Sequence, residues 1–174
     1  MDLEDLQIEG IRDLMADEVD LDIAENRLYT SKRLKPGFRD MYTTLLKDAI
    51  VDGDPNSFAQ CILNEKCLVS VEPSSRSKTG MKKVPWNAHI VLGEGEFNRF
   101  FIRALCRKAI EEGYKLEIYR AKEVNKPRSI SKSLIGTEVD PNVLLNDLRE
   151  NIGVDTALGV PPGPSSGLSV RLIK

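Results

Sequence analysis

The segment 94–113 constrains the fold most, because as a helix it must be covered on most of its circumference. One apolar stripe consists of residues at helical spacing, namely Phe97, Phe100, Phe101, Ala104, Leu105 and Ala109. Ile102, Cys106 and Ile110 add a second stripe beside the first. Gly113 is expected to end the helix, because glycine adopts the left-handed conformation found there. We therefore expect the rest of the chain to wrap around this helix.

The narrow polar edge of the same helix carries a row of basic residues, Arg99, Arg103, Arg107 and Lys108. The three arginines are four residues apart, so they follow one line along the helix. Guanidinium groups bind carboxylates and phosphates bidentately, which makes the row a candidate partner-binding site. The alternative is a solvated face steadied by Arg107–Glu111 and Lys108–Glu112 pairs. The sequence leaves both interpretations open.

The chain of 174 residues suits a single domain, and its net charge of -2 hides an asymmetry. Residues 1–60 contain 14 acidic and 7 basic residues, a net of -7, whereas residues 61–174 contain 13 acidic and 18 basic residues, a net of +5. Two such halves can attract each other within one chain or between neighbouring copies. No signal-like start and no run of about 20 apolar residues occurs, so we expect the protein to be made and assembled in the cytoplasm of its host.

The first sixty-odd residues are predicted to be helical. Helices are expected over 3–15, 38–50 and 55–63, the last with Asp54 as its cap and Pro55 at its first position. The acidic run 16–26 between the first two is either a solvated linker or an acidic arm that seeks a basic patch.

Beyond residue 65 the periodicity changes to that of strands. Strands are expected over 67–71, 86–92 and 114–119, with an exposed basic loop over 73–83. Asp140 and Pro141 predict the start of another helix. The Pro- and Gly-rich linker 159–167 precedes an alternating strand over 168–173. That strand could close its own sheet or add to the sheet of a neighbour, so Leu168, Val170 and Leu172 are candidate partner-binding residues.

These elements predict an α+β fold, in which a helical N-terminal region is followed by a small mixed sheet packed on a central helix, with an extended C-terminal arm. Three regions are expected. Residues 1–65 form the helical acidic N-terminal region or arm, residues 66–158 form the α+β core, and residues 159–174 form the Pro/Gly linker with the C-terminal strand or arm.

Catalytic and ligand motifs occur only in fragments. Ser129–Lys132 matches S-x-x-K and Lys78–Gly80 matches K-T-G, but their order is reversed relative to penicillin-recognising enzymes. Residues 93–96 are better interpreted as a strand-to-helix turn than as a phosphate loop, because Glu94 and Glu96 would repel an anion. His89, the single histidine, is expected to be packed. We therefore predict no catalytic residue, cofactor or metal, and Cys106 is expected to be a small core residue.

Four stretches support a resemblance to a known family, namely Val91–Phe100, Arg103–Cys106, Ile118–Lys122 and the tail Gly153–Leu172. Over residues 86–174 the chain resembles small tailed-bacteriophage proteins encoded among head-assembly genes. The resemblance implies a non-enzymatic structural component of the virion, such as a minor capsid, cement or head–tail connecting protein. Its partners would be other copies of itself and major capsid or portal-type proteins.

Two other classes of function remain open on the sequence. The alternative hypothesis is a nucleic-acid-binding protein that uses a basic face over residues 76–128, which includes Arg76, Lys78, Lys82, Lys83, Lys126 and Arg128. The third hypothesis is an enzyme that uses His89 or a loop serine.

Overall fold

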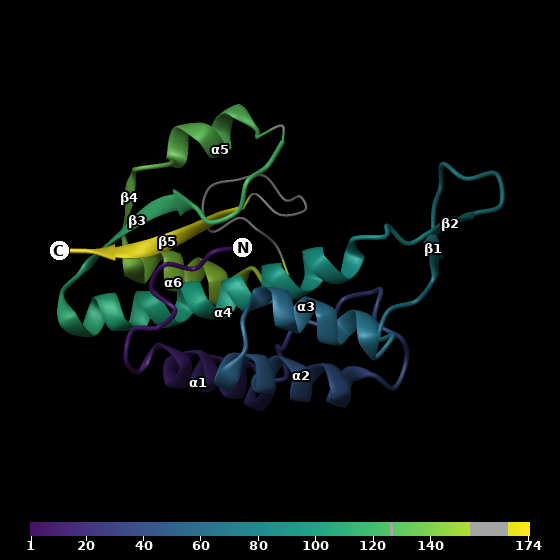
Figure 1. Ribbon diagram of the computed structural model, residues 1–174, viewed down its shortest axis with the longest axis horizontal. Coiled ribbons are helices and arrows are strands. Elements are labelled where there is room, and N and C mark those ends of the chain that lie inside the picture. The colour runs from purple at the N-terminus through teal and green to yellow at the C-terminus, as the bar shows by residue number, and fades with distance from the viewer. Residues whose placement is uncertain (126, 154–166) are drawn as a thin grey trace.

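The structure is a computed structural model that describes residues 1–125, 127–153 and 167–174. It confirms the α+β class (Figure 1). The helices are α1 (Ile11–Ala24), α2 (Arg39–Asp52), α3 (Pro55–Asn64), α4 (Ala88–Glu112), α5 (Ser129–Leu134) and α6 (Pro141–Glu150). The strands are β1 (Val71–Pro73), β2 (Met81–Lys83), β3 (Lys115–Arg120), β4 (Glu138–Val139) and β5 (Leu168–Ile173).

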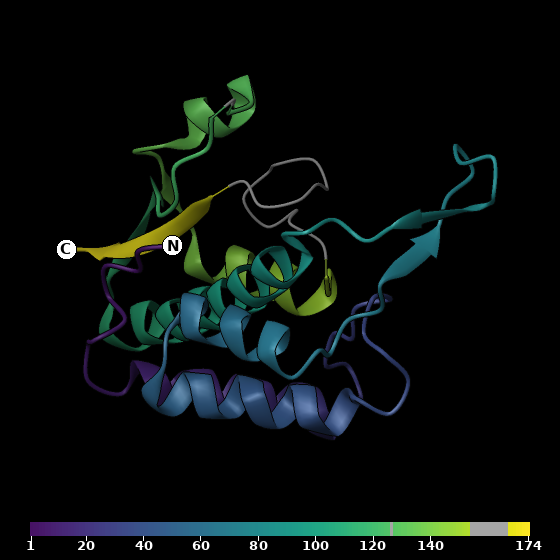
Figure 2. The same cartoon turned by 45° about the vertical axis from the view of Figure 1, so that its right-hand side comes forward.

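Helix α4 is the centre of the fold, as predicted. It lies between the α1–α3 layer and the sheet, with α6 alongside it, and this arrangement is seen in two views (Figures 1 and 2). Gly113 ends it in the left-handed conformation, with φ of 73°. The helix begins earlier than expected, at Ala88, so the predicted strand over 86–92 is wrong. A short apolar run fits a buried helix as well as a strand, and here it forms the first turns of α4.

The predicted turn at residues 93–96 is also wrong, because it lies inside α4. A Cβ atom built on Gly93 would lie 2.7 Å from the Ala59 Cα of α3. The absence of a side chain at Gly93 therefore lets the backbones of α3 and α4 pack closely. Gly95, two residues on, has nothing within 4 Å of the equivalent position.

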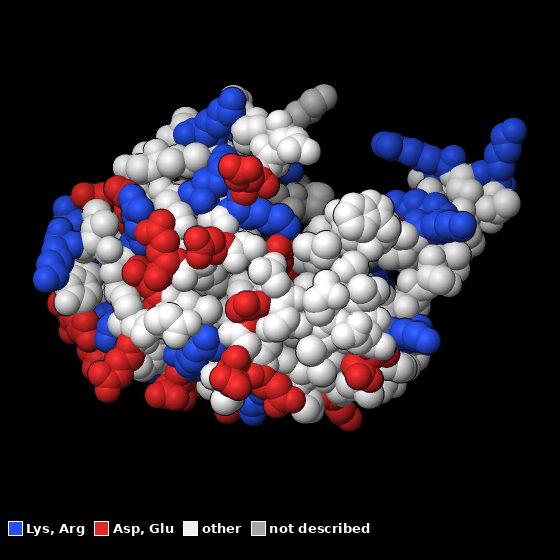
Figure 3. Space-filling view, viewed as in Figure 1, with Lys and Arg blue, Asp and Glu red and all other residues white. Residues whose placement is uncertain are grey.

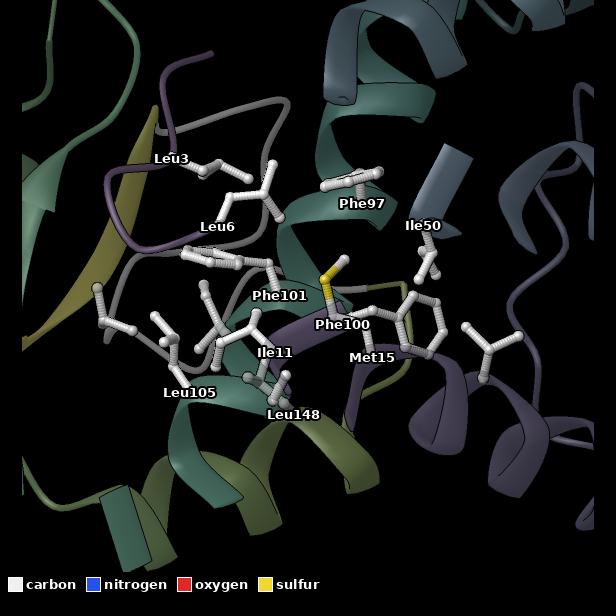
Figure 4. Close-up of a cluster of buried hydrophobic side chains, with 14 of the residues drawn as sticks. Leu3, Leu6, Ile11, Met15, Ile50, Phe97, Phe100, Phe101, Leu105 and Leu148 are labelled. Atoms are coloured by element: carbon white, nitrogen blue, oxygen red, sulfur yellow. The ribbon is translucent and has the colours of Figure 1, made fainter. Parts of the chain in front are cut away.

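The aromatic residues of α4 form the middle of the core. Phe97, Phe100 and Phe101 are fully buried and pack in one cluster with apolar side chains from the N-terminal turns, α1, α2 and α6 (Figure 4). The labelled partners are Leu3, Leu6, Ile11, Met15, Ile50 and Leu148. One continuous core cluster runs from Leu3 to Val170. All three of the expected regions therefore contribute to the same core.

The first helix is displaced relative to its prediction. Residues 4–10 form turns rather than helix, and α1 begins at Ile11 after Gly10, whose φ is 80°. The acidic run expected as a linker or arm is most of α1 itself. Helices α2 and α3 confirm their predictions, and the Asp54 side chain accepts hydrogen bonds from the N–H groups of Asn56 and Ser57.

The main sheet has the strand order β4–β3–β5 and both pairings are antiparallel, so the prediction of a mixed sheet is wrong. Strand β5 pairs with β3 along its whole length, from Leu168↔Arg120 to Ile173↔Lys115. Residues 168–173 thus close the chain's own sheet and are not an extended arm. The linker residues 159–166 lie outside the described residues.

Candidate interaction surface

The predicted arginine row lies mostly inside the molecule. Arg103 has 0% of its surface exposed and faces α1. Its Nε donates to Glu18 Oε2 at 2.7 Å, and its Nη1 donates to Asp22 Oδ2 at 2.7 Å. Arg103 therefore recognises carboxylates, as guanidinium chemistry suggested, but they belong to its own chain. The acidic segment does meet a basic patch, and the contact is intramolecular.

Glu18 is the hub of this network, because three arginines converge on it. Arg149 of α6 donates from Nε to Glu18 Oε2 at 3.0 Å, and Arg107 Nη1 lies 3.4 Å from Oε1. Burial alone would raise the pKa of Glu18, but hydrogen bonds and charges from Arg149 and Arg103 outweigh it and lower that pKa. The network ties α1, α4 and α6 together through ionised groups.

The two remaining residues of the row also contact their own chain. Arg99 is buried, and its Nη1 donates to the Asn151 carbonyl oxygen at 3.1 Å. The predicted Lys108–Glu112 pair is present at 2.8 Å. The row is thus part of the internal packing, and only Arg107 and Lys108 remain partly accessible.

The C-terminal candidates are placed similarly. Leu168 and Val170 are buried in the core, and Leu172 is partly buried against it. Asn98 of α4 fixes the strand by donating to the Leu168 carbonyl at 3.0 Å and accepting from the Ser169 hydroxyl at 2.7 Å. In this fold the three apolar residues pack within the chain.

The surface available to a partner lies elsewhere, on a β-hairpin that projects from the body (Figures 1 and 2). Strands β1 and β2 pair antiparallel in the register Val71↔Lys83, Glu72↔Lys82 and Pro73↔Met81. The loop between them is closed by hydrogen bonds from the Ser74 N–H to the Gly80 carbonyl and from the Gly80 N–H to the Ser77 carbonyl. The predicted basic loop over 73–83 is therefore the end of an ordered hairpin.

The base of the hairpin is anchored to the segment before α2. Arg33 donates to both carboxylate oxygens of Glu72, at 2.6 and 3.1 Å. Hydrogen bonds from Arg33 and Lys82 lower the pKa of Glu72 to about 2. The Val69 N–H also donates to the Arg33 carbonyl at 2.8 Å. These contacts fix the direction in which the hairpin leaves the body.

The hairpin is basic along its length. Arg76, Lys78, Lys82 and Lys83 are all exposed, and Figure 3 shows Lys and Arg side chains gathered on the hairpin at the upper right. Lys82 is paired with Glu72 at 3.1 Å. Within the described residues, Arg76, Lys78 and Lys83 form no ion pair. They are therefore available to acidic groups of a partner.

An apolar pocket of about 250 Å³ lies where the hairpin joins α3 and α4. Its lining includes Leu63, Leu68, Val84, Trp86 and His89. Trp86 is 82% exposed, which is unusual for the largest apolar side chain of a protein. His89 is buried, as expected for a packed histidine. The basic hairpin and the apolar pocket together form a surface that suits an acidic partner segment carrying apolar side chains.

Two features of the sequence pointed to this surface, the basic loop and Trp86. The predicted strand over 86–92 included Trp86, and that prediction hid its exposure. The predicted basic face over residues 76–128 is interrupted, because Lys122 is paired with the buried Glu94. Lys126 lies outside the described residues.

The catalytic fragments are not brought together. Ser129–Lys132 lies in α5, and Lys78–Gly80 lies at the hairpin end, far from α5 in both views (Figures 1 and 2). Among residues 1–125, 127–153 and 167–174, no group of three or more His, Cys, Asp or Glu side chains could hold a metal ion.

No helix in the described part of the chain is both long and apolar enough to cross a membrane.

Comparison with protein-family models, with curated proteins and with solved structures finds no match for this chain.

Proposed function

We propose that this protein is a non-enzymatic structural component that works through protein–protein contacts, and that it serves in the virion of a tailed phage. A minor capsid, cement or head–tail connecting role fits this proposal. The single observation that carries the binding role is the projecting β1–β2 hairpin with the apolar pocket at its base. The phage setting rests on the sequence resemblance over residues 86–174.

The binding role is supported by the chemistry of the surface. A two-stranded hairpin standing clear of the body has no packing function for the core, yet Arg33 and Glu72 hold it in one direction. Exposed Trp86 and Leu63 beside it are the kind of apolar side chains that become buried in an interface core. The cationic side chains around them would form the polar rim.

The proposal is tested by measuring co-sedimentation of the purified chain with purified major capsid or portal-type phage protein. We expect wild type to bind and Trp86→Ser to bind at least about ten-fold more weakly, since aromatic anchors dominate interfaces. Val143→Ser is the matched control, because Val143 is also largely exposed but lies on α6. Equal binding by Trp86→Ser and wild type would remove the pocket from the proposal.

The basic hairpin also supports a second candidate function, nucleic-acid binding. Three unpaired cationic side chains on a projecting hairpin can follow a phosphate backbone. This hypothesis predicts DNA retention at about 50 mM salt that falls steeply as salt rises. The structure offers no recognised nucleic-acid motif in its described residues, so protein contact remains the first proposal.

A further inference from the structure

Helix α2 presents an acidic outer face that matches the hairpin in charge. Asp40, Asp48 and Asp52 of α2 are exposed, and Asp48 and Asp52 are neighbours on the helix surface at i and i+4. None of these three carboxylates forms an ion pair with another described residue. In Figure 3 acidic side chains lie along the lower edge, where α1 and α2 run in Figure 1.

The same face carries exposed apolar side chains. Val51 is 70% exposed and Met41 is 41% exposed, and both lie among the aspartates on the helix surface. The hairpin offers a similar mixture, since Val71 and Met81 are exposed beside its lysines. Both surfaces thus combine charges with a few apolar side chains, and the signs of the charges are opposite.

The hairpin cannot reach α2 of its own chain. It points away from the body, and α2 lies on another side of the molecule in both views (Figures 1 and 2). Strands β1 and β2 pack mainly against each other. The Arg33–Glu72 anchor holds the hairpin in this direction. The complementary surfaces can therefore meet only between two molecules.

We infer that the β1–β2 hairpin of one copy docks on the acidic outer face of α2 in a second copy. Lys78 and Lys83 would face Asp48 and Asp52, and Met81 would pack near Val51. Because two different surfaces of the chain meet, a pair still has one free surface of each kind, the α2 face of the first copy and the hairpin of the second. Further copies can therefore add, unless the set closes on itself. The inference rests on the proposed function and names one of its partners.

The experiment uses sedimentation velocity on the full chain over a range of concentrations. Two charge-reversal variants are compared with wild type, Lys78→Glu/Lys83→Glu on the hairpin and Asp48→Lys/Asp52→Lys on α2. We expect wild type to self-associate, and each variant to associate at least about ten-fold more weakly, as like charges now face each other. Association of wild type should weaken between about 0.1 and 1 M salt, as the Debye length falls from about 10 to about 3 Å.

A mixture of the two variants gives the sharpest result. The acidic hairpin of one variant faces the basic α2 of the other, so mixing should restore association that neither variant shows alone. Lys132→Glu/Lys174→Glu changes the net charge as the hairpin variant does, but on exposed residues away from both surfaces, and it should associate like wild type. Restoration on mixing would separate this contact from a general effect of net charge.

Several outcomes would overturn the inference. They are a wild-type chain that stays monomeric at every concentration, association unchanged in both variants, and no restoration on mixing. A monomeric chain whose hairpin variant loses DNA binding would favour the nucleic-acid hypothesis instead. The proposed function can fail separately from this inference. If the chain self-associates but binds no capsid or portal-type protein, the contact between copies stands and the proposed virion partner is ruled out.

Discussion

Arg103 and Asp22 form a bidentate ion pair in the interior, with Nη1–Oδ2 and Nη2–Oδ1 distances of 2.7 and 3.0 Å. Both side chains are almost fully excluded from water. Arg103 also binds Glu18, so one guanidinium compensates two buried carboxylates. Such a site is stable only while all its members are present, because an isolated buried charge is costly.

Replacing Arg103 by Ala is therefore expected to lower the free energy of unfolding by about 3–5 kcal/mol, since the buried Asp22 carboxylate loses its bidentate partner. Glu18 keeps its contacts with Arg149 and Arg107. Urea denaturation followed by circular dichroism measures the change. Arg107→Ala is the matched control one turn along α4. It should cost less than about 1 kcal/mol, because Arg107 is partly solvated. Equal losses in the two variants would contradict the assigned role of Arg103.

The lowered pKa of Glu18 predicts a loss of stability in acid. The folded state holds the Glu18 proton less tightly than the unfolded state, so this carboxylate stabilises the fold above its ordinary pKa. That contribution is lost as the pH falls through the ordinary range near 4 and on toward the lowered pKa. Glu18→Gln should be less stable than wild type at pH 7, and the difference should shrink toward acid pH.

The pKa of Glu96 is shifted in the opposite direction to that of Glu18, so its effect on the pH dependence of stability is also opposite. Burial raises its pKa, and the charge of Arg99 only partly opposes this effect. The folded state keeps the Glu96 proton to higher pH than the unfolded state, so its contribution to stability falls as the pH rises. Glu96→Gln should therefore flatten the curve of stability against pH on its upper side, where Glu18→Gln leaves it unchanged. If both variants changed the same side of the stability–pH curve, the opposite pKa shifts of Glu18 and Glu96 would be wrong.

The two glycines of α4 make a matched pair. Gly93→Ala should destabilise by about 1–3 kcal/mol, because its Cβ would overlap the Ala59 backbone of α3. Gly95→Ala should stabilise by about 0.5–1 kcal/mol, because its position is open and alanine favours a helix. Thermal unfolding of the two variants beside wild type measures both. A stabilising Gly93→Ala would show that α3 and α4 are not in close contact there.

The contact that anchors the hairpin can be followed through the pKa of one carboxylate, that of Glu72. In wild type the pKa of Glu72 should be about 2 in a carbon-detected NMR titration, because Arg33 and Lys82 hydrogen-bond to it. Since this pKa is depressed, the anchor should persist as the pH falls and be lost only near that value. Arg33→Ala should return the Glu72 pKa toward its usual range and weaken amide exchange protection in β1 and β2. An unchanged pKa would mean that the hairpin is held by other contacts.

Helices were predicted best from the sequence where apolar residues recur at helical spacing, or where a capping residue marks the start of the helix. The α4 stripe, the Asp54–Pro55 start of α3 and the Asp140–Pro141 start of α6 are all in place. The run over 86–92 failed because its apolar residues have no distinguishing period and Gly93 looked like a stop. Glycine is needed at position 93 because Ala59 of α3 lies so close to it, and this contact between distant residues leaves no pattern in the local sequence.

The candidate site was harder to predict for a similar reason. Opposite charges in residues 16–26 and 99–107 indicated an attraction, but not whether it lies within a chain or between chains. The answer depends on Glu18 and Asp22 sharing one face of α1 at i and i+4, turned toward Arg103. Exposure of the hairpin and of Trp86 is likewise a property of the assembled fold, because it depends on what the core leaves uncovered.

The buried ion cluster also sets an order of events during synthesis. Glu18 and Asp22 precede Arg103 by 85 and 81 residues. At about 5–20 residues per second, the ribosome needs roughly 4–17 seconds to add a stretch of that length. During that time the two carboxylates lack the Arg103 guanidinium, so the ion pairs that hold α1 against α4 cannot form before α4 emerges. The nascent chain must therefore remain soluble with its acidic helix open to water, and that helix's negative charge is well suited to keep it so.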